Sequence, residues 1–590
     1  MPYRAPVADM LFTMTHAAGL AQGVASGLYP DLADGAAEAI LDEAAKMAEG
    51  VLAPLNRIGD QKGATFANGT VTTAPGWPDA YRRWVEGGWM GVTAPEAHGG
   101  MGLPHLLNAG CIEAWNGANM AFALAPLLSV GAIEALVAHG SEDLRATYLD
   151  KIVSGQWAAT MNLTEPQAGS DLAALRTRAE RAPDGSYRLT GQKIYITYGE
   201  HDLTDNIIHL VLARLPDAPA GTRGISLFLV PKFLVKEDGS LGARNDLRCG
   251  GIEHKMGIHG SPTCTMIFGD DGGATGWLIG EENRGLACMF TMMNNARLSV
   301  GLQGVGVAER ATQTAIAFAH ERRQGRAPGA TGDAMSPIVA HPDVRRMLLE
   351  MRAATAAARA ICYMTAHALD LAHRGDSPEL RRAALERAGL LTPVAKAYAT
   401  DVANEVASQG VQVHGGMGFI EETGAAQMMR DARIAAIYEG TNGIQAIDLV
   451  GRKLALSGGA AFQSELADMR AVVDRLRAAP ADRLGSMPAR LEAAVTALAQ
   501  ASETIAARLT EHPAAALAAA TPYLRLFALA RGGTALAALA LAEDAEGGQW
   551  LTLARVYAQN IACAAPGLAL TVCDDAQAIL AADAALVGDA

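Results

Sequence analysis

The central stretch of this chain follows a different pattern from the rest, and this difference constrains the fold most. Between residues 158 and 275, short segments either alternate apolar and polar residues or are wholly apolar, as β-strands do. Pro183-Asp184-Gly185 precedes one of these segments and predicts a hairpin turn, so the sheet is at least partly antiparallel. The predicted strands are Ser186–Thr190, Lys193–Thr197, Ile207–Leu212 and Ile225–Val230. The sequence therefore predicts a β domain in the middle of the chain.

The sequence on either side of this β domain has the composition and period of α-helices. Apolar residues make up 50% of the 590 residues and aromatic residues only 5%, which favours closely packed helices. Apolar positions recur at helical spacing in Leu32–Ile58, Leu286–His320, His341–Arg374 and Ser377–Gln409. We therefore expect a mainly α fold with a central β domain.

A chain of this length exceeds what one hydrophobic core organises, so several domains are expected. We predict an N-terminal helical domain at 1–157, a middle β domain at 158–275, a helical bundle at 276–457 and a C-terminal helical extension at 460–590. The last boundary falls at the small-residue segment Ser457-Gly458-Gly459-Ala460.

The charge of the chain argues against nucleic acids and anionic membranes as partners. Its formal net charge is −14 and it has no run of lysine or arginine. Its seven cysteines are scattered and never spaced as Cys-x-x-Cys, so we expect reduced thiols and no metal site. The N-terminus lacks the apolar core of a secretory signal, and charges such as Arg531 and Glu543 interrupt the apolar C-terminal segments. We expect a cytoplasmic protein with no segment that spans a membrane.

A loop with several possible hydrogen-bonding groups leads into the β domain. Met161–Asp171 contains the hydroxyls of Thr164 and Ser170, small residues and a proline, and could hold the edge of a heteroaromatic ring. The alternative is an ordinary turn that caps a short helix. Tyr195 and Thr197, one hairpin later, favour the first interpretation because an aromatic and a hydroxyl could cover the same ring.

Two later segments could hold phosphates. His320–Arg326 contains three arginines, which pair well with phosphate oxygens, although a solvated helix end is the alternative. Val411–Phe419 contains glycines that let a dinucleotide approach the main chain, and we expect a loop there. Neither segment is a Walker or Rossmann motif.

Glu439 lies in the segment Ala436–Gln445, between an aromatic residue and a glycine. A carboxylate in such a place could act as a base on a small molecule. The alternative is that Glu439 is only a charge at a helix N-terminus and Gly440 a turn residue.

Taken in order, these motifs resemble the acyl-CoA dehydrogenase family. The set comprises Thr-Glu-Pro-x-Ala-Gly-Ser-Asp, Tyr-Ile-Thr, Glu-Arg-Arg-Gln-Gly-Arg, Gln-x-x-Gly-Gly-x-Gly-Phe and Tyr-Glu-Gly-Thr-Asn-x-Ile-Gln, and it spans Gly91 to Lys453. The opening residues Tyr3–Phe12, the segment Arg248–Gly257 and the helical tail resemble a longer bacterial branch. That branch includes 3-methylmercaptopropionyl-CoA and broad-range fatty acyl-CoA dehydrogenases. The resemblance implies a helical N-domain, a β-barrel-like middle domain, a helical bundle and an additional C-terminal helical domain.

The resemblance also implies a role for each matching residue. Glu439 would be the catalytic base, and Ser170, Arg297 and Gly440 would lie near the substrate. FAD would be held by Met161, Thr164, Ser170, Tyr195, Thr197, Arg322, Gln412, Gly415, Gly416, Thr441 and Asn442, with Arg322 reaching the FAD of a neighbouring subunit. Two departures from the family stand out. Tyr195 replaces a usual tryptophan, and Gln324-Gly325 replaces a usual aromatic-glycine pair.

The reaction that the resemblance implies is α,β-dehydrogenation of an acyl-CoA thioester. Glu439 would remove the α-proton while a hydride passes from Cβ to flavin N5, giving trans-2-enoyl-CoA. Electron-transferring flavoprotein would reoxidise the FAD, and a homodimer or dimer of dimers is expected. The resemblance leaves two acyl groups open, 3-methylmercaptopropionyl and a short or medium fatty acyl group. It also leaves two pathways open, DMSP demethylation and fatty acid β-oxidation. An acyl-CoA oxidase is the nearer alternative. A DNA-associated flavoprotein is a further one, which the acidic charge disfavours.

Overall fold

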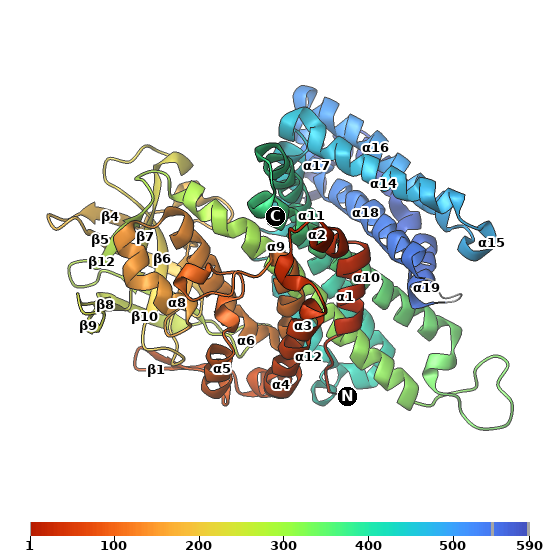
Figure 1. The fold of residues 1–590 in the computed structure, drawn as a ribbon, viewed down its shortest axis with the longest axis horizontal. Helices are drawn as coiled ribbons and strands as arrows, with labels where there is room; N and C mark the ends of the chain where they lie inside the picture. The colour runs from red at the N-terminus through yellow and green to blue at the C-terminus, as the bar shows by residue number, and fades with distance from the viewer. Residues whose placement is uncertain (1, 544–547, 587–590) are drawn as a thin grey trace.

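The computed structural model describes residues 2–543 and 548–586. The β domain lies at one end of the molecule, long helices fill the centre, and the last helices of the chain lie on the other side (Figure 1). The fold is mainly helical with a central β-barrel domain and a C-terminal helical region, as the sequence predicts.

Short helices and one very long helix make up the N-terminal part. These are α1 (Val7–His16), α2 (Leu20–Ala25), α3 (Ala36–Met47), α4 (Ala53–Lys62), α5 (Trp77–Glu86) and α6 (His105–His139), with a small hairpin of β1 (Thr65–Ala67) and β2 (Thr70–Thr72). The predicted single helix Leu32–Ile58 is α3 and α4 joined by a π-helical turn, Ala48–Leu52. Helix α6 is kinked at Asn119, whose φ and ψ of −161° and 88° are not helical. The Asn119 side chain accepts a hydrogen bond from the Phe122 N–H, so the helix restarts after the kink.

The β domain is an eight-stranded sheet with two parallel contacts. Its main order is β10-β11-β5-β12-β7-β6-β3, and β4 pairs with β5 and β6. Only the β3–β6 and β4–β6 pairs are parallel among the described strands. The strands are β3 (Ala158–Asn162), β4 (Arg178–Arg181), β5 (Tyr187–Thr197), β6 (Ile207–Arg214), β7 (Ile225–Pro231), β10 (Leu247–Ile252), β11 (Thr263–Phe268) and β12 (Ala274–Ile279), with a separate hairpin of β8 (Phe233–Val235) and β9 (Leu241–Arg244).

The predicted hairpin and strands are present in this sheet. Arg181 pairs with Tyr187 across the turn, where Gly185 has a φ of 81°, so β4 and β5 are antiparallel as expected. The two segments predicted on either side of Gly191 form the single strand β5. The sheet encloses a core of its own, separate from the core that the helices share.

Three long helices form the centre of the molecule: α9 (Gly285–Glu321), α10 (Pro342–Arg374) and α11 (Pro378–His414), followed by α12 (Ala425–Ala432) and α13 (Asn442–Asp448). The predicted loop over Val411–Phe419 is wrong in its first half, because α11 continues to His414. The side chains of Val413 and His414 are buried, which keeps the last turn helical until Gly415, with a φ of 60°, ends it. Gly415–Phe419 then form a short 3₁₀-helix rather than an open loop.

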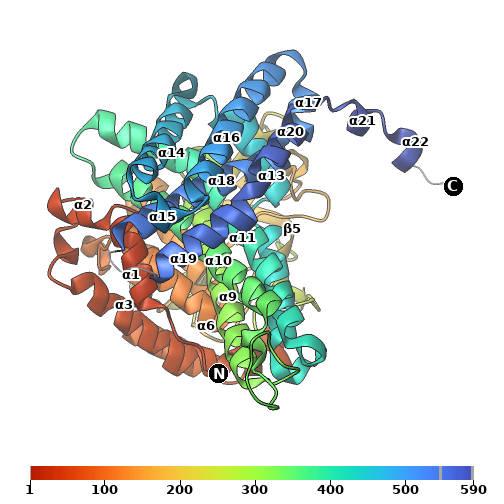
Figure 2. The same ribbon diagram turned by 90° about the vertical axis from the view of Figure 1, so that its right-hand side faces the viewer.

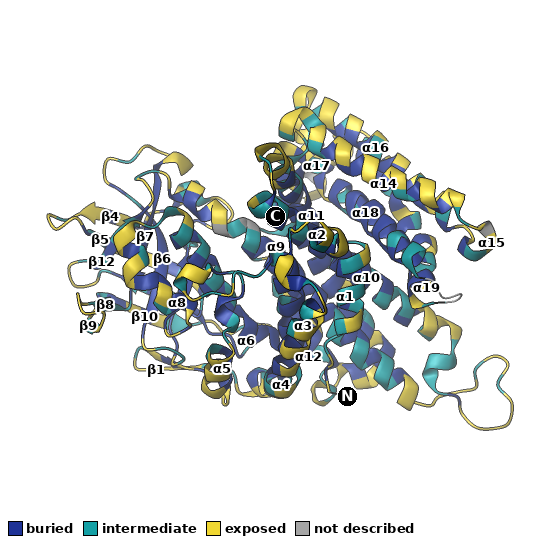
Figure 3. Cartoon of the chain, in the orientation of Figure 1, coloured by how far each residue is buried: buried dark blue, intermediate teal, exposed yellow. Residues whose placement is uncertain are grey.

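The C-terminal helices pack directly on this bundle. They are α14 (Ala460–Ala478), α15 (Ala481–Leu484), α16 (Met487–Glu511), α17 (Pro513–Ala518), α18 (Ala520–Ala542), α19 (Gln549–Val556) and α20 (Ala565–Cys573). Helix α18 is almost wholly buried, beneath α14 and α16 (Figure 3). The short helices α21 (Gln577–Leu580) and α22 (Asp583–Leu586) project from the body of the molecule (Figure 2).

The expectation that no segment is long and apolar enough to cross a membrane is wrong. Three segments meet that criterion by length and composition: His105–His139, Ala520–Ala542 and Gln549–Cys573. In the first two segments, 78% and 83% of the most apolar stretch is buried inside the protein, and in the third segment 33%. Helices in the interior of a large bundle are apolar all round, so they reach the hydropathy of membrane spans. The charge of Arg531, expected to interrupt such a segment, is itself buried and paired with Glu465 at 2.6 Å.

Candidate active site

Glu439 lies in a strained turn between the bundle helices. Its φ is 55°, a left-handed conformation that side-chain-bearing residues rarely adopt, and Gly440 follows with a φ of 84°. A φ of 84° favours glycine at this position, and a Cβ on Gly440 would also lie 2.7 Å from Nε2 of Gln445. The same Nε2 donates to the Glu439 carbonyl at 3.2 Å, and Thr441 caps α13 by accepting from the Ile444 N–H. These contacts hold Glu439 at the N-terminal end of α13.

Two cationic side chains act on the Glu439 carboxylate. Burial raises the pKa of Glu439 above its usual value, while the charges of Arg297 and Lys396 oppose that rise. Arg297 comes from α9, is buried, and lies 3.6 Å from Asp448. Burial lowers the pKa of Lys396, from α11, to about 7, against the opposing charges of Glu439 and Asp401. The net effect is a carboxylate whose proton affinity exceeds that of a solvated glutamate, as a general base for a weak carbon acid requires.

The turn is also tied to α11 by hydrogen bonds. The Lys396 ammonium donates to the Gly440 carbonyl and to Oδ1 of Asn442, both at 2.9 Å. Nδ2 of Asn442 donates to Asp401 at 2.7 Å. Asn442, predicted as a cofactor residue, therefore also anchors the turn.

A cavity of about 530 Å³ lies beside this turn. Its lining includes Thr441, Asn442 and Gly443 from the start of α13, and Met256 from the β domain. The other lining residues are Asp401, Asn404, Met429, Arg433, Ala436 and Ile437. The cavity thus opens where the β domain meets the bundle, next to the turn that carries the carboxylate.

Several buried polar atoms around Glu439 lack a hydrogen-bond partner among the described residues. They are Nε of Arg297, Nε2 of Gln303 and Oε1 of Gln445. The Gln303 side chain also accepts a hydrogen bond from the Tyr438 hydroxyl, next to Glu439. Unsatisfied buried groups are costly, so these atoms are consistent with a polar ligand in this region.

The predicted flavin loop is fixed to β5. The Ile194 N–H donates to the Thr164 carbonyl at 2.9 Å, and the Lys193 ammonium donates to the Leu163 carbonyl at 3.0 Å. These bonds bring the loop alongside the strand that carries Tyr195. Beneath the loop, Glu165 is buried and accepts from Lys193 at 2.8 Å. Burial alone would raise the pKa of Glu165, but Lys193 and further donors lower it to about 2.

Tyr195 is turned outward at an irregularity in β5. The pairing of β11 with β5 shifts between Cys264 and Met266, so Tyr195 is left out of the register. Its φ is 61° and its side chain is 59% exposed, which is unusual for a large aromatic residue. Thr197, two residues on, is half-buried and accepts a hydrogen bond from the Thr160 hydroxyl through its carbonyl. Tyr195 is therefore available to cover a flat ligand.

The remaining predicted residues of this loop differ in exposure. Met161 is buried on β3, Thr164 is half-buried and Ser170 is exposed. Only the last two can offer hydroxyls to a ligand, and Met161 can contribute only its main chain without leaving the core.

The predicted phosphate-binding residues form a separate cluster at the far end of the bundle. Arg322 follows α9 and is exposed, as are Gln412, Gly415 and Gly416 at the end of α11. The two helix ends are joined by stacked rings of Phe318 and His414, whose centroids are 4.4 Å apart. Among the described residues, no hydrogen bond links Arg322 to the Glu439 turn. The structure thus brings these four residues together but away from Glu439.

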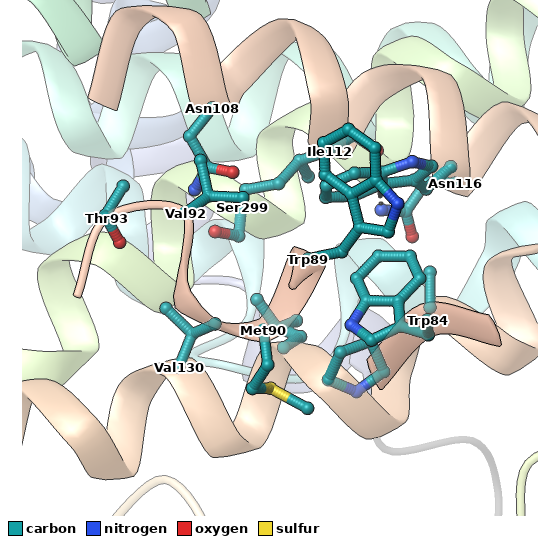
Figure 4. Close-up of a pocket in the computed structure, with 14 residues that line it drawn as sticks. Trp84, Trp89, Met90, Val92, Thr93, Asn108, Ile112, Asn116, Val130 and Ser299 are labelled. Carbon is teal, nitrogen blue, oxygen red and sulfur yellow. Dashed lines mark hydrogen bonds between the residues drawn. The ribbon is translucent and has the colours of Figure 1, made fainter. Parts of the chain in front are cut away.

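A second, much smaller cavity lies against α6. Its volume is about 30 Å³, and Trp84, Trp89 and Ser299 are among its lining residues (Figure 4). Ala123, Pro126 and Leu127 also line it, from the stretch of α6 that follows the kink. A cavity of this size holds about one water molecule, so little free space remains there.

Sequence reasoning assigned no role to Lys396, Gln303 or Asp448, and none to Gln445, although Gln445 ends the motif that contains Glu439. Lys396 had one recognisable signal, a single positive charge within the apolar stretch Leu390–Ala399 of a predicted helix. A lone charge on a buried face requires a partner, but that partner lies 44 residues along the chain.

Models of acyl-CoA dehydrogenase domains match most of the chain. The N-terminal, middle and C-terminal domains match residues 35–156, 160–270 and 283–455, and an acetyl-CoA dehydrogenase C-terminal-like domain matches 466–583.

Individual proteins agree with these matches. The chain is 50% identical to the 3-methylmercaptopropionyl-CoA dehydrogenase of Ruegeria pomeroyi, over 78% of this chain and 77% of that protein. It is 35% identical to the broad-specificity linear acyl-CoA dehydrogenase FadE5 of Mycobacterium tuberculosis, over 80% and 78% of the two chains. The structure of a Bacillus anthracis acyl-CoA dehydrogenase complexed with FAD has the same fold, with a TM-score of 0.74, 23% identity, and coverage of 92% of this chain and 89% of that one. The chain therefore belongs to the acyl-CoA dehydrogenase family of FAD-dependent oxidoreductases and has an additional C-terminal domain.

Proposed function

We propose that this enzyme converts a short acyl-CoA, such as 3-methylmercaptopropionyl-CoA, to its trans-2-enoyl thioester, with Glu439 as the base that removes the α-proton. The observation that carries the proposal is the strained Glu439 turn, in which a carboxylate of raised pKa lies beside Arg297 and a cavity. Strain of this kind costs free energy and persists where the surroundings enforce it, often at functional sites.

The residues around Glu439 suit this reaction. A thioester α-proton is weakly acidic, so removing it calls for a base kept from water and for hydrogen-bond donors near the developing enolate oxygen. We assign the Glu439 main-chain N–H to that second role. Arg297 would contribute positive charge near the substrate, and Gly440, which directly follows the base, would lie near the substrate as well. Ser170, exposed on its loop, would contact the substrate.

The chain offers a site for FAD. Bound there, FAD would supply the acceptor for the hydride that leaves Cβ. Thr164, Ser170, Tyr195, Thr197 and the main chain at Met161 would hold the ring region from the β domain. Thr441 and Asn442 would hold it from the bundle, where they line the 530 Å³ cavity.

A second group of residues would hold the FAD of a neighbouring subunit. A Cβ added to Gly415 or Gly416 would meet no atom within 4 Å, so the main chain there is open to a ligand. With Arg322 and Gln412, which are exposed beside them, these glycines would receive the phosphate region of that FAD.

The choice of a short acyl group rests on one relative. The Ruegeria relative carries the name of a 3-methylmercaptopropionyl-CoA dehydrogenase, and the identity to it is 50%. Fatty acyl groups of short or medium length remain the second candidate, favoured by the relative with broad specificity for linear acyl-CoAs.

Glu439→Gln tests the role of the base. The variant keeps the shape of the side chain but cannot accept the α-proton, so we expect normal FAD content and a loss of flavin bleaching by acyl-CoA of at least about a thousandfold. Stopped-flow absorbance of the flavin under anaerobic conditions measures the rate. Bleaching at the wild-type rate would rule out Glu439 as the base.

A substrate screen tests the acyl group. Single-turnover flavin reduction is compared for acyl-CoAs from propionyl to palmitoyl and for 3-methylmercaptopropionyl-CoA, and we expect the highest specificity with the last and with chains of similar length. A preference for palmitoyl-CoA would contradict the proposal. Measuring peroxide during turnover separates a dehydrogenase from an acyl-CoA oxidase, because only the oxidase passes its electrons to oxygen.

We also propose that electron-transferring flavoprotein is the electron acceptor. We propose a homodimer or dimer of dimers as the assembly and the cytoplasm as its location. The exposed Arg322 cluster supports the assembly, because it lies apart from the Glu439 turn of its own chain. Turnover coupled to purified electron-transferring flavoprotein tests the first point, and sedimentation of the FAD-loaded enzyme tests the second.

A further inference from the structure

Lys396 is a fully buried lysine at the centre of α11, with an exposed fraction of 0%. Its ammonium donates to two neutral oxygens, the Gly440 carbonyl and Oδ1 of Asn442, each at 2.9 Å. Among the described residues it forms no ion pair within 4.0 Å. A buried ammonium without a directly bonded carboxylate is costly, so a structural role alone does not account for it.

Lys193 shows what a structural buried lysine looks like in the same molecule. It is equally buried, and its ammonium makes a 2.8 Å ion pair with Glu165 beneath the flavin loop. Lys396 differs because both of its acceptors belong to the turn that carries Glu439. The carboxylate that balances its charge is therefore Glu439 itself, supported by Asp401.

We propose that Lys396 is a positioning residue for the base: its ammonium fixes the Glu439–Gly440 turn through the Gly440 carbonyl and Asn442, and it brings a positive charge to that turn. This inference rests on the proposed function of Glu439. Gly440 directly follows Glu439, so holding its carbonyl restrains the left-handed conformation of the base. The charge of the same ammonium opposes the rise that burial causes in the pKa of Glu439.

The charged groups that act on Lys396 come from three directions. Glu439 and Asp401 favour its protonated form, while Arg297 and burial oppose it. Arg297 also acts on Glu439, so the base lies in the field of two cations from different helices, α9 and α11. Removing the Lys396 charge leaves Arg297 alone against the burial of Glu439.

Two substitutions separate the charge of Lys396 from its hydrogen bond. Lys396→Gln keeps an N–H donor for the Gly440 carbonyl but removes the charge, whereas Lys396→Arg keeps the charge. Lys453→Gln is the matched control, because Lys453 lies near Arg297 and Asp448 but is not among the groups that act on Glu439. FAD content and the visible flavin spectrum check that each variant retains its site.

The rate of flavin reduction is measured against pH for each variant. We expect Lys396→Gln to move the midpoint of the acid limb upward, because the Lys396 charge opposes the rise that burial causes in the pKa of Glu439. Lys396→Arg and Lys453→Gln should keep the wild-type midpoint. An unchanged midpoint in Lys396→Gln, or equal shifts in Lys396→Gln and Lys396→Arg, would overturn the proposal.

A second readout does not depend on FAD or turnover. Infrared difference spectra of the apoprotein, with Glu439→Gln as the reference, report the ionisation of Glu439 as pH is varied. Its midpoint should rise in Lys396→Gln and stay constant in Lys453→Gln; an unchanged midpoint in Lys396→Gln would overturn the proposal. If no acyl-CoA bleaches the wild-type flavin, the proposed function fails, and this titration still decides whether Lys396 controls the charge of Glu439.

Discussion

At the scale of single residues, the raised pKa of Glu439 predicts how activity depends on pH. The ionised carboxylate is the working form of a base, and burial raises its pKa above the usual value of 4.5. As the pH falls through this raised value, Glu439 takes up a proton and flavin reduction should slow. The measurement is the single-turnover rate at saturating acyl-CoA between neutral pH and pH 4.5. A constant rate over that whole range would contradict the prediction.

The same shift predicts that the base destabilises the protein at neutral pH. A carboxyl whose pKa is higher in the folded than in the unfolded state favours folding when protonated, and this contribution is lost as the pH rises through the folded-state value. Glu439→Gln should therefore raise the thermal unfolding midpoint of the apoprotein at about pH 7.5, and the gain should shrink toward about pH 4.5. Lys453→Gln serves as the control. A lower midpoint for Glu439→Gln at the higher pH would contradict the sign.

The sequence identified the catalytic carboxylate that we propose but not the residues that surround it. Glu439, Gly440 and Thr441 are adjacent, so a local motif reveals them. Lys396 reaches the same turn from 44 residues upstream of Gly440, and nothing in its own neighbourhood identifies the partner. The roles of the FAD residues stay predictions, because the structure shows only how exposed these residues are and which of them lie close together.

At the scale of elements, periodicity predicted the long helices well. The segment Leu286–His320 corresponds to α9, Gly285–Glu321, and His341–Arg374 to α10, Pro342–Arg374. The end of α11 was missed because its glycines suggested a loop earlier than tertiary packing allows. The π-helical turn between α3 and α4 was missed because such a turn lies inside a helix without interrupting it.

A buried charge cluster joins three of these helices and can be tested. Arg359 of α10 binds Glu113 of α6 at 2.7 Å and Glu309 of α9 at 2.8 Å, and Tyr363 also donates to Glu113. Arg359→Met would leave the fully buried Glu113 without its counter-charge, which should cost about 3–5 kcal/mol. The apparent urea midpoint of the apoprotein measures the loss.

The double variant Glu113→Gln with Arg359→Met provides the control for this cluster. Removing both charges avoids an isolated buried ion, so it should regain part of the lost stability. Equal stability of the wild type and Arg359→Met would show that the cluster does not hold α6 against the bundle.

At the scale of the whole molecule, the C-terminal extension belongs to the same core as the bundle. The apolar cluster of buried residues continues from the N-terminal helices through α10 and α11 to α18 and α20. Polar contacts cross the same boundary. Glu465 of α14 binds Arg387 of α11 at 2.8 Å as well as Arg531 of α18, and the Tyr398 and Tyr557 hydroxyls lie 2.8 Å apart. The predicted small-residue boundary at Ser457–Ala460 therefore separates segments of sequence that share one hydrophobic core.

Because the hydrophobic core is continuous, we expect residues 1–459 to fold poorly without the C-terminal extension. A chain that ends at Gly459 would expose the faces of α10 and α11 that α18 covers and would leave Arg387 without Glu465. Exposed apolar surface of this extent promotes aggregation, so we expect aggregates or a strong increase in dye binding to apolar surface. A chain that ends at Asp574 is the matched control. It lacks α21 and α22, which project from the body, and it should keep the unfolding midpoint and FAD content of the full chain. If the chain ending at Gly459 were monodisperse and its flavin were bleached by acyl-CoA at the full rate, the extension would be an independent domain. Lys396 and Glu439 would then need no support from α18.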